Sequence, residues 1–444
     1  MNVLLIAIDT LRADRLGCYG HHRQTSPQID AIARKGTLFE EFIAPFIPTH
    51  PGFTTMFSGR DVFDHQIVAQ GGKQEPPEQI RFLPEILRDH GYFTAAADNL
   101  GRWFDRGYDM YQTFHWNRDP TRPWRKAEAV NETAFDILDA CEAQDAPWFA
   151  YLHYWDPHTP YLPPAPFDRM FYHGDETDPG KSSATPMMEG YPAFDSYFSD
   201  WMPSLTDIAF PKRQYDAEIA YCDAALSHIF TRLKHMEGGD DTLLIITSDH
   251  GEELDEHQMY FDHHGLYETN MHVPLIMHYP ELFSGGDRIP GMTLHQDLAP
   301  TILHALDMPE AAEEADMRGT SLLDYAGAKE HGGTREFAYI CECSWMKKRG
   351  IRTGQYKFFE SLYDELHNRP QYELYDLQQD PMEQNNLADD SPELVERFLR
   401  IMGQHVDSRL AETGQPDPIM NQEITLTRVG SLDVAVPDDQ TLEE

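Results

Sequence analysis

Two apolar segments that each end in a carboxylate constrain the fold of this chain more than any other feature. Residues 241–246 have the β-branched, apolar composition of a buried parallel strand, and Asp249 and His250 follow it closely. Residues 2–8 form a second such segment, which ends at Asp9. Ligand sites of open α/β sheets lie at the carboxyl ends of strands, so both segments predict one divalent-metal site with oxygen and nitrogen ligands. The alternative is that Asp9 and Asp249 only cap helices.

The same strand pattern recurs along the chain and alternates with helical patterns as far as about residue 330. This alternation predicts an α/β fold with a mostly parallel sheet covered by helices on both faces. Strands are expected at 37–42, 93–97, 148–154 and 273–277, and helices at 83–92, 122–141 and 213–234. From residue 336 the pattern changes to short strands, at 352–359 and 372–377, and a helix at 392–410.

We therefore predict two domains. Residues 1–335 form a catalytic α/β domain, and residues 336–444 form a C-terminal subdomain with a small antiparallel sheet and a helix. The segment 161–211, rich in Pro, Gly and Asp, is too long for an ordinary connection, and it is expected to be a lid or an interface element.

Charge and composition exclude several classes of protein. The formal net charge is -40, with 75 Asp and Glu against 35 Lys and Arg, which argues against binding to nucleic acid or to anionic lipid. Five scattered cysteines imply no disulfide framework. With neither a signal peptide nor a membrane span in the pattern, we expect a cytoplasmic protein whose partner is a small anionic substrate, and we leave a homo-oligomer open.

Thr49 is the candidate nucleophile. Residues 48–60 form a loop rich in Pro and Gly that leads into a short helix ending at Gly59, and Thr49 lies at the start of that helix. Free N–H groups and the helix dipole favour an anion there, which lowers the cost of an ionised hydroxyl. The alternative is that Thr49 is only a helix cap.

Five motifs occur in an order that is similar to one known family. Residues 2–14, 49–59, 156–161, 247–252 and 373–387 resemble the signatures of sulfatase-type members of the alkaline phosphatase superfamily. The resemblance covers nearly the whole chain. It implies a large α/β domain with a small C-terminal domain, and hydrolysis of phosphoric or sulfuric ester bonds.

Departures from the family pattern are informative. The residue that sulfatases oxidise to formylglycine, Cys or Ser, corresponds to Thr49. Oxidised threonine would be a ketone, so no formylglycine is expected. Gly52 and Phe53 stand where the family has Ser or Ala and then Arg, and His250 stands where many sulfatases have Asn. The set Asp9, Thr49, Asp249 and His250 is similar to that of single-metal phosphoryl transferases of the superfamily, and it also resembles the metal site of phosphonate monoester hydrolases.

The resemblance implies one Mn²⁺ or Zn²⁺, with Ca²⁺ less suited, held by Asp9, Thr49, Asp249 and His250. It further implies that Thr49 attacks phosphorus and forms a phospho-threonine intermediate. By the same resemblance four residues would contact the substrate or leaving group: His158, His264, Asn99 and Lys357.

Alternatives stay open at this point. His153, His257 and His263 are expected to be core or loop histidines, although Asp156, Asp262 and His263 leave a second metal possible. The first functional hypothesis is a phosphodiesterase or phosphonate-ester hydrolase. A sulfatase acting without formylglycine and a non-enzymatic anion-binding protein are the others. A transferase to a membrane acceptor is disfavoured because no membrane anchor is predicted.

Overall fold

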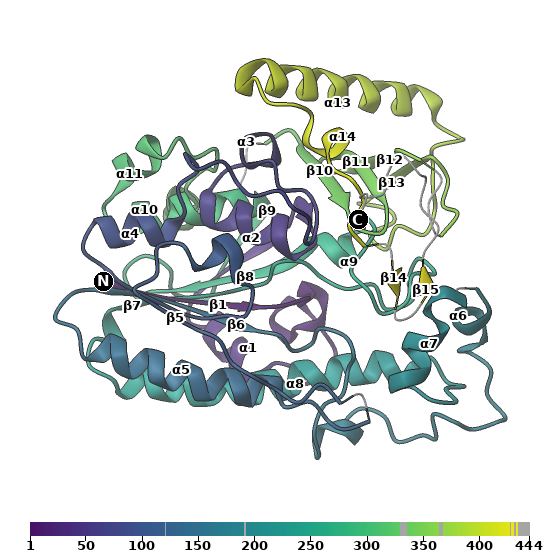
Figure 1. The fold of residues 1–444 in the computed structure, drawn as a ribbon, viewed down its shortest axis with the longest axis horizontal. Coiled ribbons are helices and arrows are strands. Elements are labelled where there is room, and N and C mark those ends of the chain that lie inside the picture. Colours follow the sequence, from purple (N-terminus) through teal and green to yellow (C-terminus); the bar gives the residue numbers. More distant parts are fainter. Residues whose placement is uncertain are drawn as a thin grey trace.

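The large sheet of the computed structural model has eight strands in the order β5-β4-β6-β1-β7-β8-β2-β9 (Figure 1). The described residues are 1–119, 121–190, 192–328, 335–363, 367–426, 428–429 and 432–433. The strands are β1 (Asn2–Ile8), β2 (Thr37–Ile43), β4 (Phe93–Ala97), β5 (Met110–Gln112), β6 (Trp148–Tyr154), β7 (Thr242–Thr247), β8 (His272–His278) and β9 (Asp287–Leu294).

Strand direction in this sheet follows the expectation with one exception. Strands β5, β4, β6, β1 and β7 run parallel, and β2 is parallel to β9. Strand β8 runs antiparallel to both of its neighbours, β7 and β2. The connection from β7 to β8 contains only the short helix α9 (Glu268–Met271). Two neighbouring strands are parallel only when a crossover connection returns the chain to the opposite edge of the sheet, and this connection has no crossover helix. The prediction of a mostly parallel sheet is confirmed.

Helices cover both faces of this sheet (Figure 1). One face carries α1 (Pro27–Ala33), α5 (Lys126–Glu142) and α8 (Ala209–His235); the other carries α2 (Thr49–Ser58), α4 (Leu83–Asp89), α10 (Leu298–Ala305) and α11 (Pro309–Glu314). Strand β1 shows the cause. Its side chains alternate between two cores, because successive residues of a strand point to opposite faces. All seven residues of β1 are buried, so the sheet needs cover on both sides.

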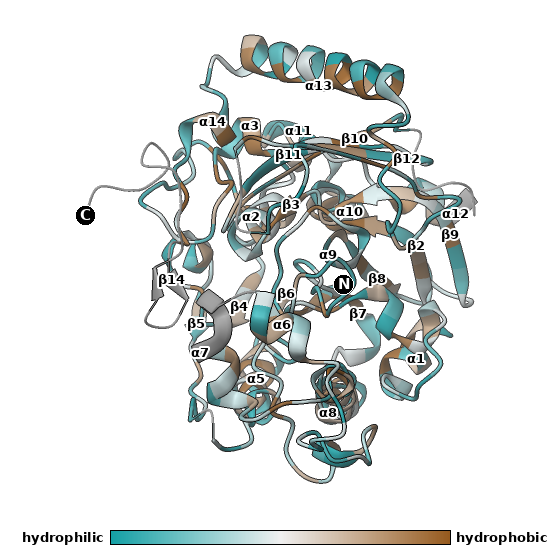
Figure 2. Ribbon diagram, turned by 90° about the vertical axis from the view of Figure 1, so that its right-hand side faces the viewer, coloured by the Kyte–Doolittle hydropathy of each residue, from teal (hydrophilic) through white to brown (hydrophobic). Residues whose placement is uncertain are grey.

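A second sheet has the order β13-β12-β11-β10-β3. It consists of β10 (Ala338–Cys343), β11 (Lys347–Arg352), β12 (Tyr356–Ser361), β13 (Tyr372–Asp376) and β3 (Phe46–Ile47), and α13 (Pro392–Thr413) lies over it (Figure 2). Strand β3 belongs to the N-terminal part of the chain and pairs in parallel with β10. Because Thr49 follows β3 after one residue, the segment that precedes the candidate nucleophile is fixed to the second sheet. The division at residue 335 stays a prediction.

The remaining elements are short. They are η1 (Ala13–Arg15), η2 (Gly17–Tyr19), α3 (Val62–His65), η3 (Arg102–Asp105), η4 (Phe167–Arg169), α6 (Thr185–Gly190), α7 (Pro192–Trp201), η5 (Gly239–Asp241), η6 (His295–Asp297), α12 (Leu323–Ala328), α14 (Pro418–Asn421), β14 (Arg428–Val429) and β15 (Leu432–Asp433). In the described part of the chain, no helix combines the length and the apolar character that crossing a bilayer requires. All five cysteines are free.

Candidate metal centre and active site

Three predicted ligands meet at the carboxyl end of the large sheet. Asp9 follows β1, while Asp249 and His250 follow the neighbouring strand β7, and the two strands are in register up to the pair Ala7 and Thr247. One potential ligand atom from each of the three residues lies within 4.8 Å of the other two, and all three side chains are fully buried. The ends of two adjacent parallel strands thus bring together residues that are 240 positions apart in the sequence.

The carboxylates of this cluster have free acceptor capacity. Both oxygens of Asp9 and Oδ2 of Asp249 are buried without a well-formed hydrogen bond from the described residues, although Nε2 of His153 lies 3.4 Å from Oδ2 of Asp9 and Nε2 of His250 lies 3.2 Å from Oδ2 of Asp249. Oδ1 of Asp249 accepts the backbone N–H groups of Thr10 at 3.2 Å and His250 at 2.9 Å. Buried carboxylate oxygens are normally hydrogen-bonded, so oxygens that lack a well-formed hydrogen bond fit a site for a cation.

The pKa values of the two carboxylates are shifted in opposite directions. Burial alone would raise the pKa of Asp9, but contact with His153 and the charges of His158 and His250 bring the pKa of Asp9 well below its usual range. Burial and the negative charge of Asp9 raise the pKa of Asp249. Two like charges this close disfavour joint ionisation. A divalent cation between them would remove that repulsion.

His250 is oriented with Nε2 towards Thr49 and Asp249. Its Nδ1 lies 2.9 Å from the carbonyl oxygen of Gly251, so Nδ1 carries a proton and donates it there. Nε2 lies 3.1 Å from Oγ1 of Thr49 and 3.2 Å from Oδ2 of Asp249. This nitrogen can therefore accept the threonine hydroxyl hydrogen or bind a metal.

Thr49 is the first residue of α2 and is 4% exposed. Close packing of this first turn depends on Gly52, because a Cβ at that position would lie 3.0 Å from the carbonyl oxygen of Asp249. Phe53, which stands where the family pattern has Arg, places its ring 4.9 Å from that of His153. The helix start that carries the hydroxyl is thus packed directly on the strand end that carries the predicted ligands.

His158, a predicted substrate contact, is linked to this cluster by ring contacts with a third histidine, His263. The ring of His263 is 4.7 Å from that of His250 and 5.1 Å from that of His158. Burial lowers the pKa of His158 to about 4. Burial would also lower the pKa of His263, but Asp262 and Glu252 raise it to about 10. Sequence reasoning assigned His263 to a loop; its position one residue before the predicted His264 was the available signal.

Three other predicted residues are engaged elsewhere. Nε2 of His264 lies 2.6 Å from Nε2 of His367. Asn99 exchanges two hydrogen bonds with the backbone of Phe114, at 2.9 and 3.0 Å. Lys357 is fully buried, and its Nζ lies 2.8 Å from Glu268 and 2.8 Å from Glu383. The substrate roles of His264, Asn99 and Lys357 stay predictions, and these contacts give each residue a structural role as well.

Lys126 is a residue that sequence reasoning missed. Its Nζ lies 2.7 Å from the carbonyl oxygen of His158, 3.3 Å from that of Trp155 and 3.4 Å from Oδ1 of Asp156. The side chain is 1% exposed. A buried ammonium group in α5 therefore fixes the loop that carries His158.

The insertion predicted at 161–211 packs on the same loop. Tyr197 in α7 forms a 2.8 Å hydrogen bond with the hydroxyl of Thr159, and Trp201 packs its ring against those of Tyr161 and Phe261. The insertion thus contacts the loop that follows β6, and its role as a lid or interface element stays a prediction.

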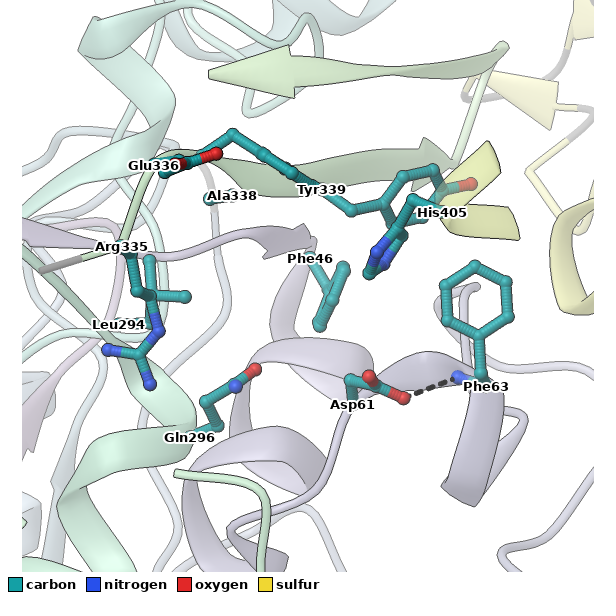
Figure 3. Close-up of a pocket in the computed structure, with 11 residues that line it drawn as sticks. Phe46, Asp61, Phe63, Leu294, Gln296, Arg335, Glu336, Ala338, Tyr339 and His405 are labelled. Atoms are coloured by element: carbon teal, nitrogen blue, oxygen red, sulfur yellow. Dashed lines mark hydrogen bonds between the residues drawn. The ribbon is translucent and has the colours of Figure 1, made fainter. Parts of the chain in front are cut away.

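A separate cavity of about 360 Å³ lies between the two sheets, beside α3 and α13 (Figure 3). Its walls include the aromatic side chains of Phe46, Phe63 and Tyr339, with His405 on α13. None of the residues that line it belongs to the predicted site. The metal-ligand cluster and this cavity are therefore different features of the fold.

Comparison with known proteins gives family matches over most of the chain. The family model described as "Sulfatase" matches residues 1–308, and the model "N-sulphoglucosamine sulphohydrolase, C-terminal" matches residues 255–406. The first match alone spans more than half of the chain. Together the two matches extend over the large sheet, the second sheet and the first part of α13.

The individual relatives have low sequence identity to this chain. Choline-sulfatase of Rhizobium meliloti (strain 1021) is 26% identical over 435 residues, covering 87% of this chain and 82% of the relative. Iduronate 2-sulfatase of Homo sapiens is 23% identical, covering 63% of this chain but only 60% of the relative. The crystal structure of phosphonate monoester hydrolase of Agrobacterium radiobacter superposes with a TM-score of 0.70 at 22% identity, covering 93% of this chain and 96% of that one. By the extent of the family match, the chain belongs to the sulfatase family.

Proposed function

We propose that this protein is a metal-dependent hydrolase of phosphate esters, either phosphodiesters or phosphonate monoesters, with Thr49 as its nucleophile. The observation that carries the proposal is the 3.1 Å contact between Oγ1 of Thr49 and Nε2 of His250, beside two buried carboxylates. Because threonine cannot be converted to the formylglycine aldehyde, its hydroxyl has to act as it stands.

The residues present fit a divalent cation. Asp9, Thr49, Asp249 and His250 would hold it, and the carboxylate oxygens that lack a well-formed hydrogen bond are the observation that supports this. A mixed set of oxygen and nitrogen ligands suits Mn²⁺ or Zn²⁺ better than Ca²⁺. When bound, the cation would lower the pKa of the threonine hydroxyl and neutralise charge on the substrate.

The chain's own side chains define the rest of the reaction. The hydroxyl of Thr49 loses its proton to solvent, and Oγ1 attacks phosphorus as the bond to the leaving ester oxygen breaks, which gives a phospho-threonine and an alkoxide. The ring of His263 lies between those of His250 and His158, and His263, whose pKa is raised to about 10, is the group placed to protonate that alkoxide, while His158 is a proposed contact of the leaving group. Water then attacks phosphorus, and Thr49 recovers its hydroxyl. His264, Asn99 and Lys357 are further proposed contacts of the substrate.

Sulfate-ester hydrolysis is the second candidate. The relatives named above include choline-sulfatase and iduronate 2-sulfatase. A sulfate monoester and a phosphodiester each carry one negative charge, so a site built for one accommodates the other. A non-enzymatic member that binds an anion is a third candidate, which the assembled ligand set opposes.

Hydrolysis of three nitrophenyl substrates by the Mn²⁺-loaded or Zn²⁺-loaded protein tests these candidates. Bis(p-nitrophenyl) phosphate should be cleaved faster than p-nitrophenyl phosphate or p-nitrophenyl sulfate, and Thr49→Ala should abolish the activity. If p-nitrophenyl sulfate is cleaved fastest, the sulfatase candidate replaces the phosphoesterase. Absence of hydrolysis together with tight sulfate binding would favour the anion-binding protein.

Partners and location follow the same proposal. We propose a small anionic ester as the partner of the site, a cytoplasmic location, and no binding to nucleic acid or to a membrane, which the net charge of -40 supports. Light scattering of the purified chain would establish whether it forms a homo-oligomer.

A further inference from the structure

A row of polar side chains crosses the carboxyl edge of the large sheet over four neighbouring strands, β5, β4, β6 and β1. Tyr111 in β5 donates its hydroxyl hydrogen to Oδ2 of Asp98, which follows β4. Oδ1 of Asp98 lies 2.7 Å from Nδ1 of His153 in β6. Nε2 of His153 lies 3.4 Å from Oδ2 of Asp9, which follows β1. The row therefore ends at a predicted metal ligand.

Asp98 is held from a second direction by the loop that follows β4. Its Oδ2 also accepts the backbone N–H of Leu100 at 3.2 Å, and the hydroxyl oxygen of Tyr111 accepts the N–H of Gly101 at 2.9 Å. Asp98 and His153 are both fully buried. The carboxylate therefore has one fixed orientation before any ligand binds.

The ring of His153 is enclosed by aromatic side chains. Phe53 meets it edge-on at 4.9 Å, and the rings of Trp155 and Tyr151 lie 5.0 and 6.1 Å away. A ring enclosed in this way cannot rotate freely, so the hydrogen bond to Asp98 and the contact to Asp9 occur together. The imidazole acts as a rigid spacer between the two carboxylates.

Buried charged groups at these strand ends destabilise the fold unless they have a function at the site. Burying a histidine and two carboxylates removes each charge from water, and apolar residues at the same strand ends would avoid that desolvation. Groups that lie behind a metal ligand fix its orientation and its basicity. The row from Tyr111 to His153 has this position relative to Asp9.

We propose that Asp98 and His153 are positioning residues that hold the carboxylate of Asp9 in its metal-binding orientation, with Tyr111 fixing Asp98. The proposal rests on the metal centre of the proposed function, but it does not depend on whether the enzyme cleaves phosphate or sulfate esters. Neither residue needs to touch the substrate.

The test is Mn²⁺ binding to the full chain, measured by titration calorimetry and by the electron paramagnetic resonance signal of the ion. His153→Gln and Asp98→Asn should each raise the Kd for Mn²⁺ about 10- to 100-fold. The Kd of the double variant for Mn²⁺ should exceed that of the weaker-binding single variant by no more than about threefold. The effects of two residues that act as one unit do not add.

His65→Gln is the matched control. His65 is as fully buried as His153, and its Nε2 lies 3.0 Å from the hydroxyl of Thr55, outside the row. This variant should lower the thermal stability and leave the Kd for Mn²⁺ within about twofold, since distant sites behave independently. A comparable loss of Mn²⁺ affinity in His65→Gln would overturn the proposal.

Wild-type Kd values in folded His153→Gln and Asp98→Asn would also overturn it. If either substitution unfolds the chain, Tyr111→Phe decides: removal of the hydroxyl should weaken Mn²⁺ binding about threefold, and unchanged affinity contradicts the proposal. Failure of the wild-type protein to bind Mn²⁺ or Zn²⁺ would instead reject the proposed metal centre. Cleavage of sulfate rather than phosphate would leave the role of the row intact.

Discussion

The imidazole of His263 lies over that of His250, with ring centroids 4.7 Å apart and planes tilted by 31°. The ring of His158 lies 5.1 Å from that of His263. Three histidines thus form a continuous group that begins beside the hydroxyl of Thr49. His264, the next residue in the chain, pairs with His367 instead. Two adjacent histidines of one loop therefore have different environments, and the geometry favours His263 for the reaction.

We predict that His263→Gln lowers kcat for bis(p-nitrophenyl) phosphate about 100-fold, which is the usual contribution of a general acid or base. His264→Gln should change kcat by less than about fivefold and should mainly lower stability, because His264 is buried 3.6 Å from Asp262. Steady-state kinetics of both variants check this. A larger loss in His264→Gln would restore the role that the resemblance implies for that residue.

Replacement of Thr49 tests the nucleophile directly. Thr49→Ala should reduce kcat at least about 1,000-fold, since the variant lacks the hydroxyl that contacts His250, whereas Thr49→Ser should keep activity within about tenfold. Thr55→Val is the control, because Thr55 lies in the same helix, is equally buried and contacts His65. Mass spectrometry of rapidly quenched enzyme should find a phosphoryl group on Thr49 and none in the alanine variant.

Much of the fold could be predicted because strand and helix patterns are local. The predicted range 148–154 coincides with β6, and the range 93–97 coincides with β4. The range 352–359, predicted as a short strand of an antiparallel hairpin or small sheet, begins at the last residue of β11, crosses the turn in which the backbone N–H of Thr353 bonds to the carbonyl oxygen of Tyr356, and continues into β12. Periodicity alone does not distinguish one strand from two halves of a hairpin.

The metal ligands could be predicted from the sequence for a similar reason. Asp9, Asp249 and His250 directly follow apolar strands, and parallel strands place such residues at one edge. Lys126 gave no such signal, because its role depends on carbonyl oxygens 29 and 32 residues away in the sequence. His153 lies inside an apolar strand, where its contact with Asp9 depends on the pairing of β6 with β1.

Removal of the metal should lower stability, because Asp9 and Asp249 then face each other without a cation. At a concentration of Mn²⁺ 100 times its Kd, the bound ion should add about 2.7 kcal/mol to the free energy of unfolding. Asp249→Asn should lose this response and should match or exceed the stability of the metal-free wild type, since one like charge is gone. Thermal melts with and without a chelator check both points. A wild-type melting temperature that does not respond to the chelator contradicts the prediction.

Glu373 in β13 offers a test in the second sheet, far from the reacting groups in sequence. Its fully buried carboxylate lies 3.3 Å from Nζ of Lys348 and 2.8 Å from Nη2 of Arg369, and it accepts 2.7 Å hydrogen bonds from Tyr267 and Tyr375. Burial alone would raise the pKa of Glu373, but the two cations and the hydrogen bonds lower it from 4.5 to about 2. The native state therefore binds this proton less readily than the unfolded chain does.

The stabilisation from Glu373 is fully present above pH 4.5 and is lost as the pH falls towards 2; its size at pH 7 is on the order of 3 kcal/mol. Glu373→Gln should therefore lower the free energy of unfolding in urea by about that amount at pH 7, and by less than half of it at pH 3. Glu342 in β10 is the control, because burial raises the pKa of its carboxylate. The cost of Glu342→Gln should shrink as the pH rises, the opposite slope. Equal pH dependence in the two variants would contradict this account of the second sheet.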